Sequence, residues 1–186
     1  MAIIFRMVLI IQVLVNLTEH AHRSAAAFSG GMRRRLGIAQ ALLNDPDMLI
    51  VDEPTAGLDP EERLRFRNLL AELGHDKLIL MSTHIVSDVE SVASELAIMR
   101  AGKLIGFGTP DDMISQAHGQ IWSVLLSSAE YEVIRQQVQL LHAQRQGEEM
   151  QVRIAHPQAP HGRAQLVVPS LEDALMAQRY SLQEVA

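Results

Sequence analysis

Met48-Leu49-Ile50-Val51-Asp52-Glu53-Pro54 is the part of the sequence from which the fold class can be inferred most directly. Its first four residues are apolar, and they predict a buried strand of a parallel sheet, because such strands carry apolar side chains on both faces. Asp52 and Glu53 follow at the carboxyl end of this strand, where open α/β sheets place their ligands. Neighbouring carboxylates are costly there unless a cation or a reacting water uses them, so the pair indicates a catalytic or metal site. The alternative is a pair of carboxylates that is simply solvated.

A second signal lies upstream, in Ser29-Gly30-Gly31, which opens a predicted helix. Ser29 is a natural N-cap, and the two glycines allow backbone amides to approach a ligand closely. The start of a helix presents free N–H groups to anions, most often phosphate, so the segment predicts a phosphate contact. Taken alone, it could equally be an ordinary capped helix. The apolar stripe of this helix is expected on Met32, Leu36, Ala39 and Leu43.

Four segments in a fixed order resemble the motifs of ATP-binding cassette (ABC) ATPases. Phe28-Ser29-Gly30-Gly31-Met32 is similar to their signature motif, and Ile50-Val51-Asp52-Glu53-Pro54 is similar to their Walker B strand. Ala56-Gly57-Leu58-Asp59 resembles their D-loop, and Ser82-Thr83-His84 resembles the switch-histidine loop that follows one strand later. On these motifs the chain is identified as a member of the ABC ATPases, of the kind found in bacterial exporters that pair with a separate membrane subunit.

The resemblance implies an α/β fold, namely part of the P-loop NTPase fold of ABC ATPases, with parallel-sheet strands and flanking helices. Residues 28–118 would form the portion that carries the signature, Walker B and switch-histidine motifs. Residues 1–27 would hold an apolar N-terminal helix and a remnant of the helical subdomain. Residues 119–186, where the composition changes, would form a small C-terminal αβ accessory region.

The resemblance also implies a role for each motif residue. In ABC ATPases two cassettes face each other head to tail and enclose ATP and Mg²⁺ between them. By this analogy Asp52 would hold Mg²⁺ through water, and Glu53 would polarise the attacking water. His84 would contact the γ-phosphate, although on its own a histidine here could also be a core residue. The other expected nucleotide-site residues would meet the partner cassette or its nucleotide: Ser29, Gly30, Gly31, Met32 and Asp59.

The expected partners follow from the same resemblance: a separate transmembrane permease, a second cassette, and a location in the cytoplasm on the inner face of the cell membrane. Composition agrees with this expectation. The sequence has no cysteine, which fits a reducing compartment. The formal net charge is −6 and there is one basic run, Arg33-Arg34-Arg35, so no nucleic-acid partner is expected. This run is expected to be a solvated face, with the alternative that one of its arginines approaches phosphate.

One motif of a nucleotide-binding cassette is missing from the sequence. A P-loop needs Gly-x-x-x-x-Gly-Lys followed by Ser or Thr, because the lysine meets the β- and γ-phosphates and the hydroxyl meets Mg²⁺. The only lysines, Lys77 and Lys103, lack glycines at that spacing. We therefore expect an N-terminally truncated cassette that does not hydrolyse ATP by itself. Two alternatives stay open: a non-enzymatic, decayed or regulatory half-cassette, and a non-transport ABC ATPase of DNA repair or translation.

The remaining elements follow from apolar periodicity and capping residues. Residues 1–15 are apolar except for Arg6 and Gln12, which predicts a packed helix rather than a signal peptide or a membrane anchor. Helices are expected over 59–74, with Phe66, Leu69, Leu70 and Leu73 buried, over 85–94, after Thr109, through Tyr131, Ile134, Val138 and Leu141, and after Ser170. Strands are expected at 77–81, 96–99, 103–105, 121–126, 150–154 and 165–168.

Overall fold

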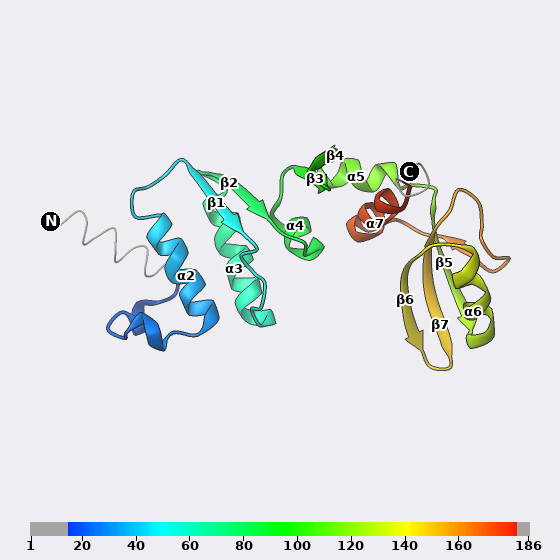
Figure 1. Cartoon of the computed structure of the whole chain (residues 1–186), viewed down its shortest axis with the longest axis horizontal. Coiled ribbons are helices and arrows are strands. Elements are labelled where there is room, and N and C mark those ends of the chain that lie inside the picture. The colour runs from blue at the N-terminus through cyan, green and yellow to red at the C-terminus, as the bar shows by residue number, and fades with distance from the viewer. Residues whose placement is uncertain (1–14, 182–186) are drawn as a thin grey trace. The chain divides into compact units, whose positions relative to one another are not determined.

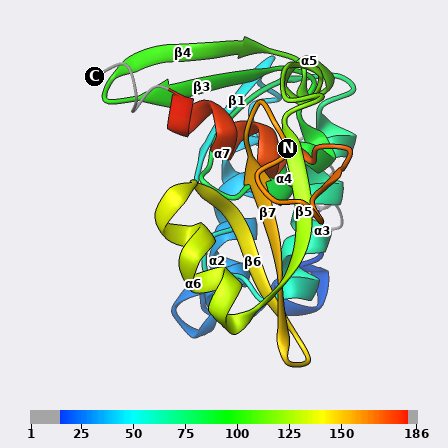
Figure 2. The same cartoon turned by 90° about the vertical axis from the view of Figure 1, so that its right-hand side faces the viewer.

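The structure of the protein is a computed structural model that describes residues 15–181, with side chains up to residue 178. It divides into two compact units, Met1–Val92 (unit 1) and Ala93–Ala186 (unit 2), whose elements are labelled in Figure 1 and Figure 2. The helix predicted at the N-terminus falls on residues 1–14, outside the described part. No helix in the described part is both long enough and apolar enough to cross a bilayer.

Unit 1 alternates helices with strands. Its elements are η1 (Thr18–His20), η2 (Ala25–Ala27), α2 (Gly30–Ala41), β1 (Met48–Asp52), α3 (Pro60–Leu73), β2 (Leu78–Ser82) and α4 (Val86–Val92). The strands β1 and β2 pair in parallel, with Met48 opposite Leu78 and Asp52 opposite Ser82. The predicted α/β class and the parallel pairing are therefore confirmed.

The core of unit 1 lies on one face of this sheet. Leu49 of β1 is buried in the same cluster as Ile38 of α2 and as Phe66 and Leu70 of α3, and Ile79 of β2 packs against it. These positions follow the period of two of the strands and the period of 3.6 of the helices. The burial predicted for Phe66, Leu69 and Leu70 is confirmed, and Leu73 is half-buried.

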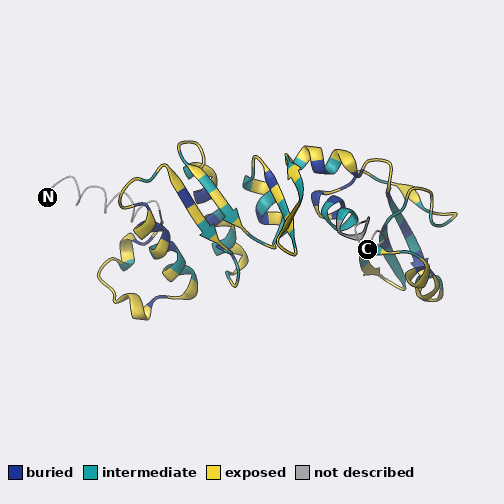
Figure 3. Ribbon diagram, turned by 45° about the horizontal axis from the view of Figure 1, so that its top comes forward, coloured by how far each residue is buried: buried dark blue, intermediate teal, exposed yellow. Residues whose placement is uncertain are grey.

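The other face of the sheet corrects the prediction of a strand buried on both sides. Ile50, Leu78 and Leu80 are 68%, 65% and 54% exposed, and Met48 is 44% exposed. The alternation of buried and exposed residues along β1 can be followed in Figure 3. The reason is that α2 and α3 contribute to the core on the face of Leu49 only. We refer to these four residues, Met48, Ile50, Leu78 and Leu80, as the open sheet face.

The helix α2 begins as predicted, after Ser29, but its buried side is rotated from the predicted stripe. Leu43 is 39% exposed, whereas Leu42 and Arg35 are buried. The helix ends at Ala41, and Leu42 is its C-cap, so the chain turns before Leu43 can continue the stripe. The expectation that the whole basic run is solvated is wrong for Arg35, whose side chain pairs with Glu62 of α3 at 3.2 Å.

Unit 2 combines a hairpin, three helices and an antiparallel sheet. Its elements are β3 (Leu96–Arg100), β4 (Lys103–Gly108), α5 (Pro110–Gln116), β5 (Ile121–Ser127), α6 (Ser128–Gln137), β6 (Leu140–Gln146), β7 (Glu149–Ala155), β8 (Gln165–Leu166) and α7 (Leu171–Ser181). The sheet has the order β6-β7-β5-β8, and Figure 2 shows β6, β7 and β5 side by side. Its core contains the fully buried residues Leu126, Val152 and Ile154.

The prediction that one helix extends through Val138 and Leu141 is wrong. The helix expected to continue through Val138 and Leu141 ends at Gln137, and Val138 is already extended. Leu141 instead lies in β6, which pairs with β7 through a tight turn at Gly147, where φ is +66°. The β-branched Val138 favours extended backbone, and pairing with β7 outweighs the helical spacing of the apolar residues. The boundary predicted between residues 118 and 119 lies inside unit 2, and the division by function stays a prediction.

Candidate functional site

The two strands of unit 1 end side by side and bring together polar residues that lie far apart in the sequence. Asp52 is the last residue of β1, and Ser82, the last of β2, lies opposite it. The Ser82 hydroxyl donates a hydrogen bond to Asp52 Oδ1. Both side chains are on the same side of the sheet as the open sheet face, because they follow its residues at intervals of two. The predicted metal-binding carboxylate is thus exposed next to an apolar surface.

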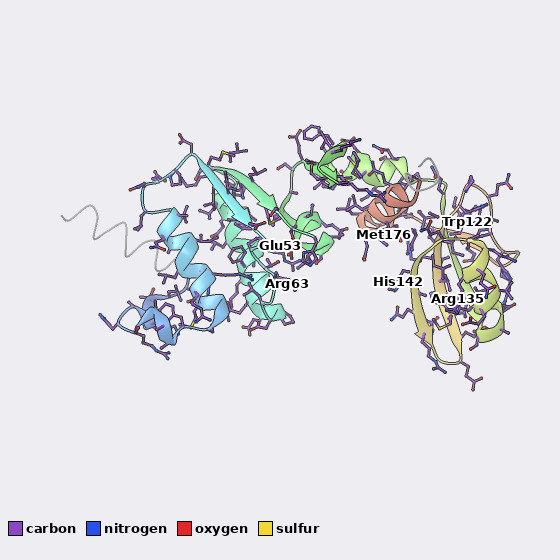
Figure 4. The ribbon with its side chains drawn as sticks, viewed as in Figure 1. Glu53, Arg63, Trp122, Arg135, His142 and Met176 are labelled. Atoms are coloured by element: carbon purple, nitrogen blue, oxygen red, sulfur yellow. The ribbon has the colours of Figure 1, made fainter. Side chains whose placement is uncertain are left out.

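Glu53 and His84 meet just beyond these strand ends. His84 Nδ1 lies 2.7 Å from Glu53 Oε1, and Figure 4 labels Glu53 at the end of β1. The side chain of His84 is 75% exposed, so the alternative of a core histidine is wrong. The other carboxylate oxygen, Glu53 Oε2, is buried and has no hydrogen-bond partner among the described residues. That oxygen therefore has a free acceptor position, which a water molecule would reach only if the surrounding side chains moved.

The backbone at Glu53 has an unusual conformation. Its φ is +45°, in the left-handed region that residues other than glycine rarely adopt and that costs roughly 1–2 kcal/mol. The Glu53 N–H donates to Ser82 O at 2.9 Å, which ties the turn to the end of β2. Strained backbone of this kind persists only where the surrounding structure enforces it, and it is concentrated at functional sites.

The start of α2 forms the second part of the candidate site. Ser29 is the N-cap, as predicted, and its hydroxyl accepts a hydrogen bond from the Met32 N–H at 3.2 Å. Gly30 has open space where a Cβ would lie, which leaves its backbone accessible. At Gly31 a Cβ would come within 3.2 Å of the Glu62 carboxylate and 3.3 Å of the Leu58 side chain, so a larger residue would require these side chains to shift slightly.

A cavity of about 400 Å³ lies between the start of α2 and the turn that precedes α3. The Arg34 guanidinium donates to the Ala56 carbonyl across it, and Arg33 is exposed. Two guanidinium groups and a helix N-terminus make this cavity suitable for an anion. Its lining residues are Gly30, Arg33, Arg34, Ala56, Gly57 and Leu58. The sequence alone assigns no specific role to Arg34. Its contact with Ala56 joins residues that are 22 positions apart, so it can be seen only in the folded structure.

Two of the predicted nucleotide-site residues have local structural roles. Asp59 is the N-cap of α3, and its Oδ1 accepts a hydrogen bond from the Glu62 N–H at 2.9 Å. The side chain of Met32 packs against the core of unit 1, so only its backbone faces the helix start. The predicted residues therefore fall into two groups: Asp52, Glu53 and His84 at the strand ends, and Ser29, Gly30 and Gly31 at the start of α2. The assignment of these residues to nucleotide binding stays a prediction.

The donor set at the strand ends fits Mg²⁺ only in part. Hard oxygen ligands such as Asp52 suit this ion, which usually keeps several waters and takes further oxygens from phosphate. The described residues contain no group of three or more acidic, histidine or cysteine side chains placed to hold a metal. An ion here would therefore depend on water and phosphate oxygens in addition to Asp52.

A smaller cavity, of about 150 Å³, lies in unit 2. Its lining includes His142 and Met176, which are labelled in Figure 4, and the ion pair between Arg153 and Asp173 at 2.7 Å. Asp173 also accepts hydrogen bonds from Ser170 at the start of α7. Arg153 and Asp173 are thus already engaged in contacts that hold the start of α7.

Comparison with known proteins finds similar sequences and structures. A family model described as ABC transporter matches residues 8–56. Among curated proteins, Nod factor export ATP-binding protein I of Ralstonia nicotianae is 42% identical over 105 residues, which cover 56% of this chain and 33% of that protein. The uncharacterized ABC transporter ATP-binding protein YxlF of Bacillus subtilis is 37% identical over 110 residues, 59% of this chain and 37% of that protein.

The solved structures give the same result for the fold. An ATP-binding cassette of an ABC transporter, in its ADP conformation, superimposes with a TM-score of 0.55 and 26% sequence identity. The match covers 61% of this chain and 45% of that cassette. The chain thus spans about a third of the length of these curated relatives and less than half of the solved cassette.

Proposed function

Since this chain is related in sequence and in fold to the ATP-binding subunits of ABC transporters, we propose that it supplies the water-activating half of an ATP-hydrolysis site. Glu53 is the residue that orients and deprotonates the attacking water. His84 holds the Glu53 carboxylate and faces the phosphate that is transferred. The observation that carries this proposal is the 2.7 Å contact between Glu53 and His84, whose side chains are both accessible to solvent.

The chemistry of phosphoryl transfer suits this arrangement. The transfer depends on positioning and on electrostatic stabilisation rather than on covalent steps by the protein. Bound Mg²⁺ neutralises charge on the phosphates. Asp52 is placed to hold this ion through water, next to the Ser82 hydroxyl that orients its carboxylate. The Glu53 carboxylate accepts the proton of the attacking water, while His84 Nδ1 donates to Oε1 and keeps the carboxylate from rotating away.

The start of α2 serves a second nucleotide in this proposal. Its free N–H groups, with Arg33 and Arg34 in the adjacent cavity, provide positive potential for the phosphates of ATP held by a partner cassette. The separation of the predicted residues into two groups supports a head-to-tail pair, in which each cassette contributes one group to each site. Asp59, exposed at the start of α3, would meet the partner there.

The phosphate loop has to come from a segment outside these 186 residues, because the sequence contains no Gly-x-x-x-x-Gly-Lys motif. The open sheet face offers a place for it. Parallel sheets are almost always covered on both faces, and the open sheet face leads directly to Asp52. In the proposed assembly this segment covers Ile50 and Leu80, a permease binds the cassette pair, and the complex works in export on the cytoplasmic face of a membrane.

The test is reconstitution. The 186-residue chain is co-expressed with the part of the Ralstonia nicotianae relative that it does not match, and Mg-dependent ATP hydrolysis of the purified complex is measured. We expect turnover in the complex and none in either part alone, and Glu53→Gln should lower kcat by about 10²-fold or more because it removes the base. Arg65→Ala is the matched control, because Arg65 forms only an exposed pair with Glu61. A stable complex whose turnover is unchanged by Glu53→Gln would overturn the proposal.

A non-enzymatic role is the second candidate, and the missing phosphate-loop lysine favours it. In that role the chain lends only its α2 surface to another cassette. Ser29→Arg would then abolish stimulation of an intact cassette, whereas Asp52→Asn would leave it unchanged. Equal loss in both variants would rule this role out, since Asp52 belongs to the other group of residues.

A further inference from the structure

Two hydrogen bonds lie on either side of the contact between Glu53 and His84. The first joins the Glu53 N–H to the Ser82 carbonyl at 2.9 Å. The second joins the Thr55 hydroxyl to Asp88 Oδ2. Glu53 and Thr55 are two residues apart, and Ser82 and Asp88 flank His84 by two and four residues. The turn that carries Glu53 is thus fastened twice to the segment that carries His84.

The second of these bonds is fully buried. Thr55 and Asp88 each have no exposed surface, and Asp88 Oδ1 has no hydrogen-bond partner among the described residues. A buried carboxylate with an unpaired oxygen lowers stability relative to a well-packed apolar pair. The pair of Thr55 and Asp88 therefore does not serve mainly to stabilise unit 1. A role in positioning the neighbouring turn explains its presence better.

The helix α4 gives the bond a firm anchor. The Ser87 carbonyl, next to Asp88, accepts a hydrogen bond from Arg67 Nη1 of α3 at 3.0 Å. The turn on the other side needs such an anchor, because Glu53 is held at a φ of +45°. If the anchor were lost, the backbone at Glu53 would relax toward negative φ, and its carboxylate would swing away from the exposed His84 ring.

We propose that Thr55 and Asp88 are positioning residues that hold the Glu53 carboxylate against His84. They touch neither nucleotide nor water and act only by fixing the turn from Glu53 to Thr55. Their importance for catalysis rests on the proposed function, whereas the geometry they enforce exists in the chain without nucleotide. The two claims can therefore be tested separately.

The geometric test uses the whole chain, with histidine labelled by ¹³C and ¹⁵N, and follows the ring resonances of His84. His84→Gln assigns the signal, and Glu53→Ala gives the position of the ring without its carboxylate partner. We expect Thr55→Val, which keeps the shape but removes the hydroxyl, to move the His84 signal most of the way to the Glu53→Ala position. Thr55→Ser and Asp88→Asn keep a donor and an acceptor and should leave the signal where it is.

Stability is measured beside the NMR signal, so that a purely structural role can be recognised. Ile38→Val is the matched control, because it weakens the core of unit 1 without touching the turn. If Thr55→Val lowers the melting temperature while His84 keeps its wild-type signal, the positioning role is wrong. If Thr55→Val does not fold, Asp88→Ala decides, because it removes the buried carboxyl group and with it the acceptor. An unmoved His84 signal in a folded Asp88→Ala chain overturns the proposal.

The catalytic test is made in the reconstituted complex described above. Thr55→Val should lower kcat by about tenfold or more and leave KM for ATP nearly unchanged, because small misplacements of a catalytic group act on the transition state. If the His84 signal shifts in Thr55→Val but no complex shows turnover, the positioning role of Thr55 and Asp88 is supported and the proposed function fails. If turnover is present and insensitive to Thr55→Val, the positioning role fails.

Discussion

The sheets of the two units differ in how completely their apolar residues are buried. In unit 2, four strands form the sheet β6-β7-β5-β8, and Leu126, Val152 and Ile154 are fully buried in its core. In unit 1, two parallel strands bury one face and leave Ile50, Leu78 and Leu80 exposed. The polar candidate site lies at the end of the incompletely covered sheet. Both units contain a buried core, but in unit 1 one apolar face of the sheet is left largely uncovered by the described residues.

The largest expected effect compares one leucine from each sheet. Leu126→Ala should destabilise unit 2 by about 2–5 kcal/mol, because it opens a cavity in a fully buried core. Leu80→Ala should change the stability of unit 1 by less than about 0.5 kcal/mol, because its side chain is already exposed. Urea unfolding of unit 2 can be followed by the fluorescence of Trp122, the only tryptophan, which lies in β5. Unfolding of unit 1 can be followed by amide hydrogen exchange of β1.

A large loss of stability in Leu80→Ala would contradict this difference between the two sheets, because it would mean that the open sheet face is covered in the free chain.

The second prediction concerns association through the open sheet face. An exposed apolar face on a short parallel sheet with unpaired edges favours aggregation. Ile50→Lys combined with Leu80→Glu should shift the chain from large aggregates toward a monomer in light scattering at the same concentration. The matched control is Val133→Lys, on an exposed apolar residue of α6 in unit 2. If the control improves solubility as much as the double variant, the open sheet face is not the cause.

A smaller effect is expected at a helix cap. The Ser127 hydroxyl accepts a hydrogen bond from the Glu130 N–H, and Glu130 bonds back to the Ser127 N–H at 2.8 Å. Ser127→Ala should cost unit 2 about 1 kcal/mol, visible in the same Trp122 fluorescence curve. Ser128→Ala, one position later in the helix, is the matched control and should change little. An equal loss in both variants would show that the cap contributes nothing specific.

The smallest effect is a dependence on acid. The backbone and side chain of Ser127, followed by Arg163, lower the pKa of Glu130 to about 2. A group whose pKa is lower in the folded state adds stability that is complete above its unfolded pKa, near 4.5, and that is lost as the pH falls toward about 2. Unit 2 should therefore lose a little stability across this window, and Glu130→Gln should lose less. An identical acid response in both chains would contradict this origin.

Local sequence signals predicted much of unit 1. The apolar run of β1, the cap at Asp59 and the buried stripe of α3 follow from period and capping chemistry, and each is present in the structure. Parallel strands end at one edge of a sheet, so Asp52 and Ser82 could be expected near each other. The roles assigned to the site residues by resemblance stay predictions.

The remaining features depend on tertiary structure. The apolar run of β1 predicts that both faces of the strand can be buried. It does not predict which face the helices of unit 1 cover. The hydrogen bond between Thr55 and Asp88 joins residues 33 positions apart. Threonine and aspartate are common on protein surfaces, so the sequence does not predict that these two form a buried pair. At Leu141, helical spacing and strand pairing compete, and the pairing of β6 with β7 decides.

The last helix of unit 2 has a consequence for the order in which the protein is made. Gln178 of α7 donates to the Ile105 carbonyl of β4, across 73 residues of sequence. Unit 2 therefore completes this contact only when its C-terminal helix has left the ribosome. Unit 1 is finished by Val92, and at about 5–20 residues per second residues 93–186 follow within about 5–20 seconds. During that interval the open sheet face is already exposed on the nascent chain, so a covering segment or a chaperone has its first opportunity before synthesis ends.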